Sequence, residues 1–66
     1  MSVGKTITLT AQSETGFEAA IRDAIGKANE TLRNIEGAWV KDQTVIIKDG
    51  QIKYFRVHLE VTFVLD

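Results

Sequence analysis

The sequence contains no cysteine and only one histidine, which excludes two common ways of stabilising a small protein. Without cysteine there is neither a disulfide nor a thiolate metal site, and one histidine cannot form a zinc site with other histidines. A chain of 66 residues buries only about 60% of its unfolded surface, so it is marginally stable alone. We therefore expect oligomerisation to supply the missing stability.

Charge and hydrophobicity exclude two further classes of partner. The net charge of −1 argues against nucleic acid as the main partner. No apolar run is long enough to span a membrane, and no signal peptide is evident. We expect one domain over residues 1–66, in a soluble cytoplasmic protein without nucleic-acid or membrane partners.

The strongest local pattern is the pair Asp49-Gly50 between two β-rich runs, residues 37–48 and 51–66. Such a pair favours a two-residue hairpin turn, because both residues adopt positive φ at low steric cost. This turn predicts six facing pairs: Lys48–Gln51, Ile47–Ile52, Val45–Tyr54, Gln43–Arg56, Lys41–His58 and Trp39–Glu60. Because the side-chain period of a strand is two, the register also assigns each residue to one face of the hairpin.

One predicted face of the hairpin is apolar and requires a cover. It consists of Ala38, Val40, Phe55, Val57, Leu59, Val61 and Phe63. Near its open end, the opposite face combines one tryptophan with glycine and polar residues: Gly37, Trp39, Lys41, Gln43, Arg56, His58, Glu60 and Thr62. Nearer the turn, the same face is predicted to carry Val45, Ile47, Ile52 and Tyr54. A tryptophan among polar side chains is unusual on a sheet face, so we place the candidate functional site there.

The first half of the chain predicts a strand and a helix. Residues 3–11 alternate threonine with apolar residues, which is typical of a half-buried strand. From Phe17, apolar residues recur at helical spacing, which predicts a helix of about 18 residues whose pattern ends at Asn34. Thr15 with Glu18 matches a capping box, and Ser13 is a competing N-cap.

The predicted fold class is α+β, with the order β-α-β-β and a three-stranded antiparallel sheet half-wrapped around one helix. We expect the helix to pack on the apolar face of the hairpin. The first strand can lie parallel to residues 37–48 or antiparallel to residues 51–66, and its length favours an antiparallel pairing with residues 59–65. The other face of the sheet would stay open to partner subunits or a ligand.

The sequence predicts no catalytic residue and no metal ligand. Ser13 and His58 show no spacing typical of a nucleophile and its base, and the carboxylates Asp42, Asp49 and Glu60 do not form an EF-hand loop. His58 is best interpreted as a solvated or interface residue, with ligand contact and a general base as alternatives. We therefore do not expect an enzyme.

Trp39 has two interpretations that the residues alone leave open. On an open sheet face, an aromatic side chain either anchors a subunit interface or stacks on a planar ligand, since it offers a large area at small entropy cost. Lys41 and Arg56 are correspondingly either solvated strand residues or part of an anion site.

The chain resembles the dodecins, a family of small flavin-binding proteins, over nearly its whole length. The resemblance lies in Ser13–Phe17, Ala19–Ala20, Ala24–Ile25, Thr31–Ile35 and Glu60–Leu65. It implies a β-α-β-β subunit in a hollow homododecamer. It also implies a storage function, in which a flavin (riboflavin, FMN or FAD) is stacked between tryptophans and quenched instead of being used in turnover.

The resemblance also implies which residues bind the flavin. The family's flavin-stacking tryptophan falls on Gly37 and its flavin-contacting glutamine on Arg56, which implies a branch that lacks the usual tryptophan position. Trp39 lies on the same face about 7 Å away and would take over the stacking. Arg56, Gln43 and Lys41 would then provide polar contacts.

An alternative follows from the same resemblance. Some relatives without the tryptophan carry arginine at the position of Arg56, and one branch of these is described as calcium-binding. The alternative function is therefore a non-flavin assembly with a structural or calcium-type role, in which Asp42 and Glu60 lie near a symmetry axis.

Overall fold

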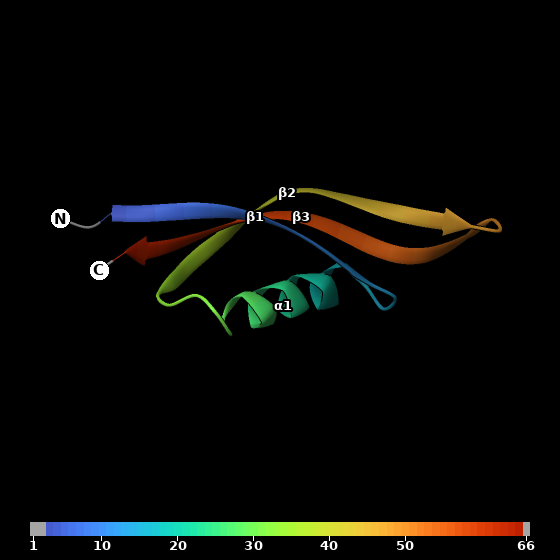
Figure 1. Cartoon of the computed structure of the whole chain (residues 1–66). Coiled ribbons are helices and arrows are strands. Elements are labelled where there is room, and N and C mark those ends of the chain that lie inside the picture. The colour runs from blue at the N-terminus through green and yellow to red at the C-terminus, as the bar shows by residue number, and fades with distance from the viewer. Residues whose placement is uncertain (1–2, 66) are drawn as a thin grey trace.

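The computed structural model describes residues 3–65 and contains three strands and one helix. Their order is β1 (Val3–Ser13), α1 (Phe17–Ala28), β2 (Ile35–Lys48) and β3 (Gln51–Leu65). The strands form one sheet in the order β1-β3-β2, and both pairs are antiparallel. Helix α1 lies along one face of this sheet (Figure 1). The predicted β-α-β-β fold and the antiparallel pairing of the first strand with the last are confirmed.

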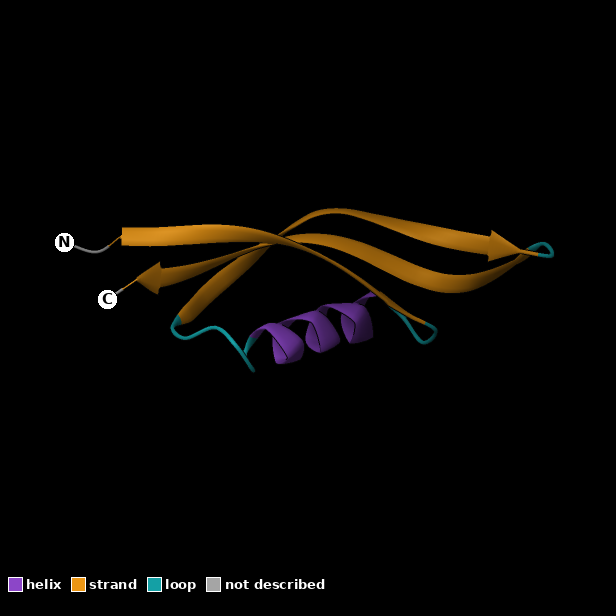
Figure 2. Cartoon of the chain, in the orientation of Figure 1, coloured by secondary structure: helices purple, strands orange, loops and turns teal. Residues whose placement is uncertain are grey.

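The turn between β2 and β3 has the conformation that the Asp-Gly pair predicts. Asp49 has φ 54° and Gly50 has φ 75°, so both central residues are in the left-handed region. The first two predicted pairs, Lys48 with Gln51 and Ile47 with Ile52, are present. This hairpin end of the sheet extends beyond the helix (Figure 2), within a molecule measuring 51 × 20 × 13 Å.

Two register irregularities shift the middle of the hairpin. After the pair Ile47–Ile52 the next pair is Ile46–Tyr54, which leaves Lys53 as an extra residue on β3. A second irregularity, between Val40 and Asp42, leaves Lys41 as an extra residue on β2. Because the extra residues lie on opposite strands, the second shift cancels the first.

Within the predicted hairpin, the pairing counted from the turn without bulges therefore fails between these two points, and a third irregularity lies at the start of β2, between Ile35 and Gly37. The predicted pair Trp39–Glu60 is present, whereas the predicted partners of Val45, Gln43 and Lys41 are wrong. The observed pairs in this segment are Val45–Phe55, Thr44–Arg56, Gln43–Val57 and Asp42–His58. Since directly paired residues share a face, Gln43 lies on the side of Val57 instead of the side of Arg56.

The core lies between α1 and the central strand. Its buried side chains are Ala20, Ala24, Ala28, Val57, Leu59 and Val61. The alanines follow one another at four-residue intervals on α1, and their short side chains let the helix approach the sheet closely. Ile7 and Leu9 of β1 pack against this core, and the ring of Phe17 meets that of Phe55 edge to face at 5.2 Å. The predicted cover of the apolar face is confirmed.

Helix α1 is shorter than predicted and begins without the predicted caps. It contains 12 residues, its N-cap is Gly16, and no side chain caps it. The hydroxyl of Ser13 accepts a hydrogen bond from the backbone of Thr15 at 3.1 Å, and Glu18 contacts Arg22 at 2.8 Å. The side chains of Ser13 and Glu18 thus make other contacts than the predicted caps, and Thr15 lies before the N-cap residue Gly16. The capping box and the Ser13 cap were wrong.

The C-terminal end of α1 explains the difference in length. Beyond Ala28, the backbone N–H of Glu30 donates to Lys27 O at 3.2 Å and that of Thr31 donates to Ala28 O at 3.1 Å. These are bonds between residues three apart, so the chain tightens into a turn. Asn34, with φ 60°, then directs the chain into β2.

Candidate ligand-binding face

The candidate site is the sheet face that α1 does not cover, called the open face below. Its residues follow from the register of β1 and β2 against β3. They form four rows across the sheet: Thr6–Thr62–Gly37, Thr8–Glu60–Trp39, Thr10–His58–Asp42 and Gln12–Arg56–Thr44. Neutral hydroxyl and amide groups thus come from β1, whereas β2 and β3 supply the tryptophan and the charged residues.

Trp39 is the largest exposed group in the middle of this face. Trp39 is 63% exposed, although its backbone is paired with that of Glu60 on the central strand β3. The Nζ atom of Lys41 lies 5.8 Å from the centroid of the indole ring and 3.2 Å from Oε1 of Glu60. An apolar ring is therefore held beside a cation and a carboxylate, with most of its surface free for another molecule.

His58 and Asp42 form a contact that the sequence did not predict. Nδ1 of His58 is hydrogen-bonded to Oδ1 of Asp42, and both side chains are partly exposed, 36% and 58%. An ionised carboxylate only accepts hydrogen bonds, so opposite an ionised Asp42 the donor in this contact is Nδ1–H of His58. The contact fixes the orientation of the imidazole in the row next to Trp39.

Arg56 is held by a neutral side chain from β1. Oε1 of Gln12 accepts hydrogen bonds from Nε of Arg56 at 3.1 Å and from Nη2 at 2.8 Å. Arg56 is half-buried and points to the same face as Trp39. Sequence analysis missed Gln12. The predicted pairing of residues 4–10 with residues 59–65, continued past Thr10, would place Gln12 opposite Val57, whereas the observed register pairs it with Arg56.

Four of the five residues predicted to bind a cofactor lie on the open face. Trp39, Lys41, Arg56 and Gly37 are there, and nothing lies within 4 Å of the position that a Cβ on Gly37 would occupy. Gln43 is the exception, because it is paired with Val57 and belongs to the opposite face. Ligand binding by the other four stays a prediction.

Metal ligands do not gather on this face in a single subunit. Within residues 3–65, no group of three or more histidine, cysteine, aspartate or glutamate side chains could hold a metal ion. The described part of the chain also contains no helix that is long and apolar enough to cross a membrane.

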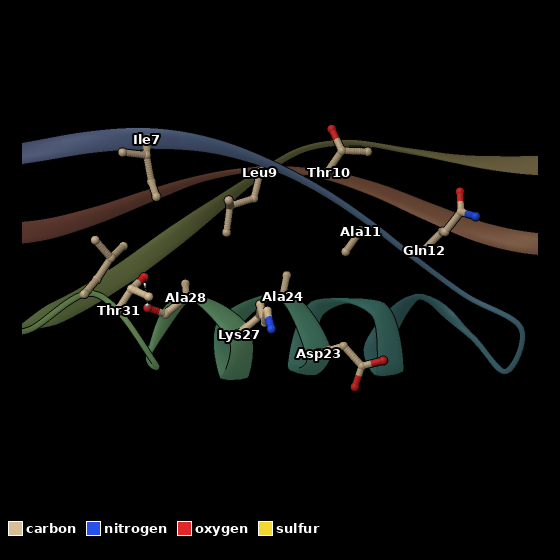
Figure 3. A pocket seen from close by; sticks show the side chains of 11 residues that line it. Ile7, Leu9, Thr10, Ala11, Gln12, Asp23, Ala24, Lys27, Ala28 and Thr31 are labelled. Carbon is tan, nitrogen blue, oxygen red and sulfur yellow. Dashed lines mark hydrogen bonds between the residues drawn. The ribbon is translucent and has the colours of Figure 1, made fainter.

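A separate apolar groove of about 420 Å³ lies on the other side of the sheet, between α1 and β1. Figure 3 shows Ile7, Leu9 and Ala11 directed from β1 toward the helix, and Ala24 and Ala28 directed from the helix toward the strand. The short alanine side chains leave this space, a consequence that sequence analysis missed. The groove is not part of the open face, because Thr10 in Figure 3 points away from the helix.

Comparison with known proteins identifies relatives over nearly the whole chain. The sequence model of the Dodecin family matches residues 3–66. The dodecin of Thermus thermophilus is 39% identical over 64 residues, which cover 97% of this chain and 93% of that protein. The crystal structure of a tryptophan-to-phenylalanine variant of a T. thermophilus dodecin has a TM-score of 0.94 and 38% identity, and the match covers 100% of this chain and 98% of that one.

Two further structures broaden the comparison. The dodecin of Streptomyces davaonensis has a TM-score of 0.93 at 31% identity, covering 98% of this chain and 96% of that chain. A calcium dodecin from Mycobacterium tuberculosis, described as a calcium chelating antigen with a novel calcium-binding site, has a TM-score of 0.86 at 32% identity, covering 98% and 93%. These matches do not bear out a separate branch without the usual tryptophan position, and Trp39 provides a tryptophan on the open face. The chain belongs to the dodecin family.

Proposed function

We propose that this chain binds and stores a flavin of the riboflavin, FMN or FAD type in a homododecamer of single-domain subunits. The observation that carries the proposal is Trp39, whose residue is 63% exposed on the open face beside Lys41. An exposed indole binds a planar ligand by stacking, and Gly37 leaves open space in the neighbouring row. Lys41 and Arg56 would contact the polar parts of the ligand.

Self-assembly is supported by the sheet edges and by the exposed apolar side chains of a single subunit. In the part of the chain that the structure describes, residues 3–65, strands β1 and β2 each pair only with β3, so the outer edges of both strands present backbone donors and acceptors. The hairpin end also exposes apolar side chains, with Val45 at 38%, Ile52 at 52% and Ile47 at 63%. Other copies of the chain would cover these groups and enclose the open face.

A binding role fits the open face better than a catalytic role. The orientation of His58 by Asp42 is also found in general bases, but such a base needs a nucleophile or a substrate proton within reach. Within residues 3–65, the hydrogen bonds of His58 include no hydroxyl group. We therefore propose no catalytic residue.

Calcium binding is a second candidate because of the calcium dodecin among the relatives. Asp42 and Glu60 are carboxylates in adjacent rows of the open face, but His58 and Lys41 already contact them. Calcium takes about six to eight oxygen ligands, so carboxylates from several copies would have to meet.

The test is a titration of riboflavin with the purified protein, combined with sedimentation. Stacking on tryptophan should quench flavin fluorescence at micromolar protein, and the particle should sediment near twelve times the 7.3 kDa of one chain. No quenching at these concentrations would reject the flavin proposal, and sedimentation as a 7.3 kDa monomer would reject the assembly. If the protein does not quench riboflavin but binds calcium, and Asp42→Asn abolishes calcium binding, the second candidate is favoured.

A further inference from the structure

The two edges of the sheet differ in how well they are protected against pairing with another strand. Strand β1 pairs with β3 over all of its 11 residues without an irregularity, and Lys5 is its one charged residue. Strand β2 has three register irregularities against β3 and contains four charged residues: Glu36, Lys41, Asp42 and Lys48. Bulges and charged side chains discourage pairing at a sheet edge. The outer edge of β1 lacks both devices except at Lys5, so it is the edge that favours an added strand.

The apolar groove of about 420 Å³ lies beside this same edge, between β1 and α1. Ile7 and Leu9 are only partly buried by the helix, and their side chains are directed toward it (Figure 3). Neighbouring strands of a sheet lie about 4.8 Å apart, so a strand added to β1 would extend the sheet beside this groove. Such a strand would have to direct apolar side chains toward the helix and polar side chains toward the open face.

Strand β1 itself has the required alternation. Ile7, Leu9 and Ala11 face the helix, and they alternate with Thr8 and Thr10, which lie on the open face. A two-fold axis perpendicular to the sheet makes two copies of β1 antiparallel neighbours and keeps both helices on the same side. Ile7 and Leu9 of each copy would then be directed into the groove of the other copy.

We infer that β1 pairs antiparallel with β1 of a second copy, so that two subunits form one six-stranded sheet. The axis passes through Thr8, the midpoint of β1, because the two strands then overlap over their whole length. Thr8 faces its own copy, and facing threonines are a favourable pair. Lys5 faces Ala11 of the second copy, so no like charges meet. This inference rests on the proposed self-assembly and specifies one of its interfaces.

The charges on α1 beside the groove are complementary in this arrangement. Asp23 and Lys27 both line the groove, one turn of the helix apart. Within residues 3–65, Asp23 forms no ion pair, and Lys27 contacts only Glu30, at 3.7 Å on the surface. The axis runs the two helices antiparallel on the same side of the joined sheet, so Asp23 of each copy approaches Lys27 of the other. Opposite charges therefore meet across the groove at two equivalent places.

The absence of cysteine makes single-cysteine variants a direct test. In an antiparallel pair, the Cα atoms of directly facing residues are about 4.5–5.5 Å apart, a separation that a disulfide can bridge. After mild oxidation with copper phenanthroline, Thr8→Cys should give a band at twice 7.3 kDa on a non-reducing gel. Thr6→Cys and Thr10→Cys are the matched controls, because they place the same thiol at exposed positions of the same strand face.

The controls follow from the register. Each of these two cysteines would lie about 13 Å from its own copy, so each single variant should stay a monomer on the gel. The double variant with both substitutions should form disulfides, because residue 6 of one copy faces residue 10 of the other. Equal yields in the three single variants would indicate random collision and would overturn the inference. A disulfide at position 6 or 10 with none at position 8 would overturn it as well.

Two outcomes separate this interface from the proposed assembly. If the particle sediments as an oligomer but none of the single-cysteine variants forms a disulfide, pairing through β1 is wrong and the assembly uses other surfaces. Sedimentation of the wild type as a 7.3 kDa monomer would reject the assembly and this interface together.

Discussion

Replacing Trp39 with alanine tests whether the indole binds ligand or holds subunits together. The residue is 63% exposed in the single subunit, so most of its side chain lies outside the core. Within the subunit, the interaction that is lost is with Lys41, 5.8 Å from the ring centroid, and such an exposed cation–π contact is worth about 0.5–1 kcal/mol. The subunit fold should therefore survive the substitution.

The expected loss of ligand binding is larger. By analogy with bases stacked on aromatic side chains, removing the ring should cost about 1–3 kcal/mol of binding free energy. This corresponds to a roughly ten- to hundred-fold increase in the Kd for riboflavin. Trp39→Phe is the matched control: it keeps an aromatic face at the same position and should retain much of the affinity.

Fluorescence titration of riboflavin, with a sedimentation measurement on each variant, distinguishes the two roles. If the ring stacks on ligand, Trp39→Ala keeps the size of the wild-type particle and loses affinity. If the ring is an interface anchor, the same variant dissociates, because each copy loses about 2 kcal/mol or more of association free energy. An intact particle with an unchanged Kd would refute the stacking role.

Two further predictions concern the fold that supports the site. Gly50→Ala should lower the melting temperature, because alanine at φ 75° costs about 1–2 kcal/mol, whereas Gly37→Ala should not, since nothing lies within 4 Å of the added Cβ. Equal melting temperatures at equal protein concentration would contradict the turn conformation. Leu59→Ala should destabilise the fully buried core by about 2–5 kcal/mol in denaturant unfolding. The control Ile52→Ala, at a residue that is 52% exposed, should cost much less, and similar losses for both would contradict the described core.

The elements and their pairing were predictable because the signals for them are local. The pair Asp49-Gly50 specifies its turn without help from the rest of the chain, and the observed φ values agree. The length of the helix was not predictable in the same way. Leu32 continues the helical spacing, and its N–H still donates to Ala28 O, yet Glu30 and Thr31 bond to residues three positions back and residues 29–31 form a turn. A short turn can preserve apolar spacing, so the pattern alone does not locate the end of the helix.

Only some residues of the candidate site were predictable, because assigning a side chain to a sheet face requires the register of its strand. Arg56 and His58 lie on β3, whose alternation is uninterrupted across the core, so their assignment to the open face holds. Gln43 lies between the two irregularities, and counting from the turn places it on the wrong face. Gln12 required the register of β1 against β3, which depends on packing between segments far apart in the sequence.

The extra residue on β2 has a consequence for the surroundings of Trp39. In a regular strand, the neighbours Lys41 and Asp42 would point to opposite faces. Because Lys41 is the extra residue, Lys41 reaches Glu60 while the next residue, Asp42, reaches His58 on the same face. One irregularity thus adds Asp42 as a second charged side chain to the open face, three residues after the tryptophan. Neither hydrophobic alternation nor the turn type encodes this irregularity, since the second shift restores the expected pairing at Trp39 itself.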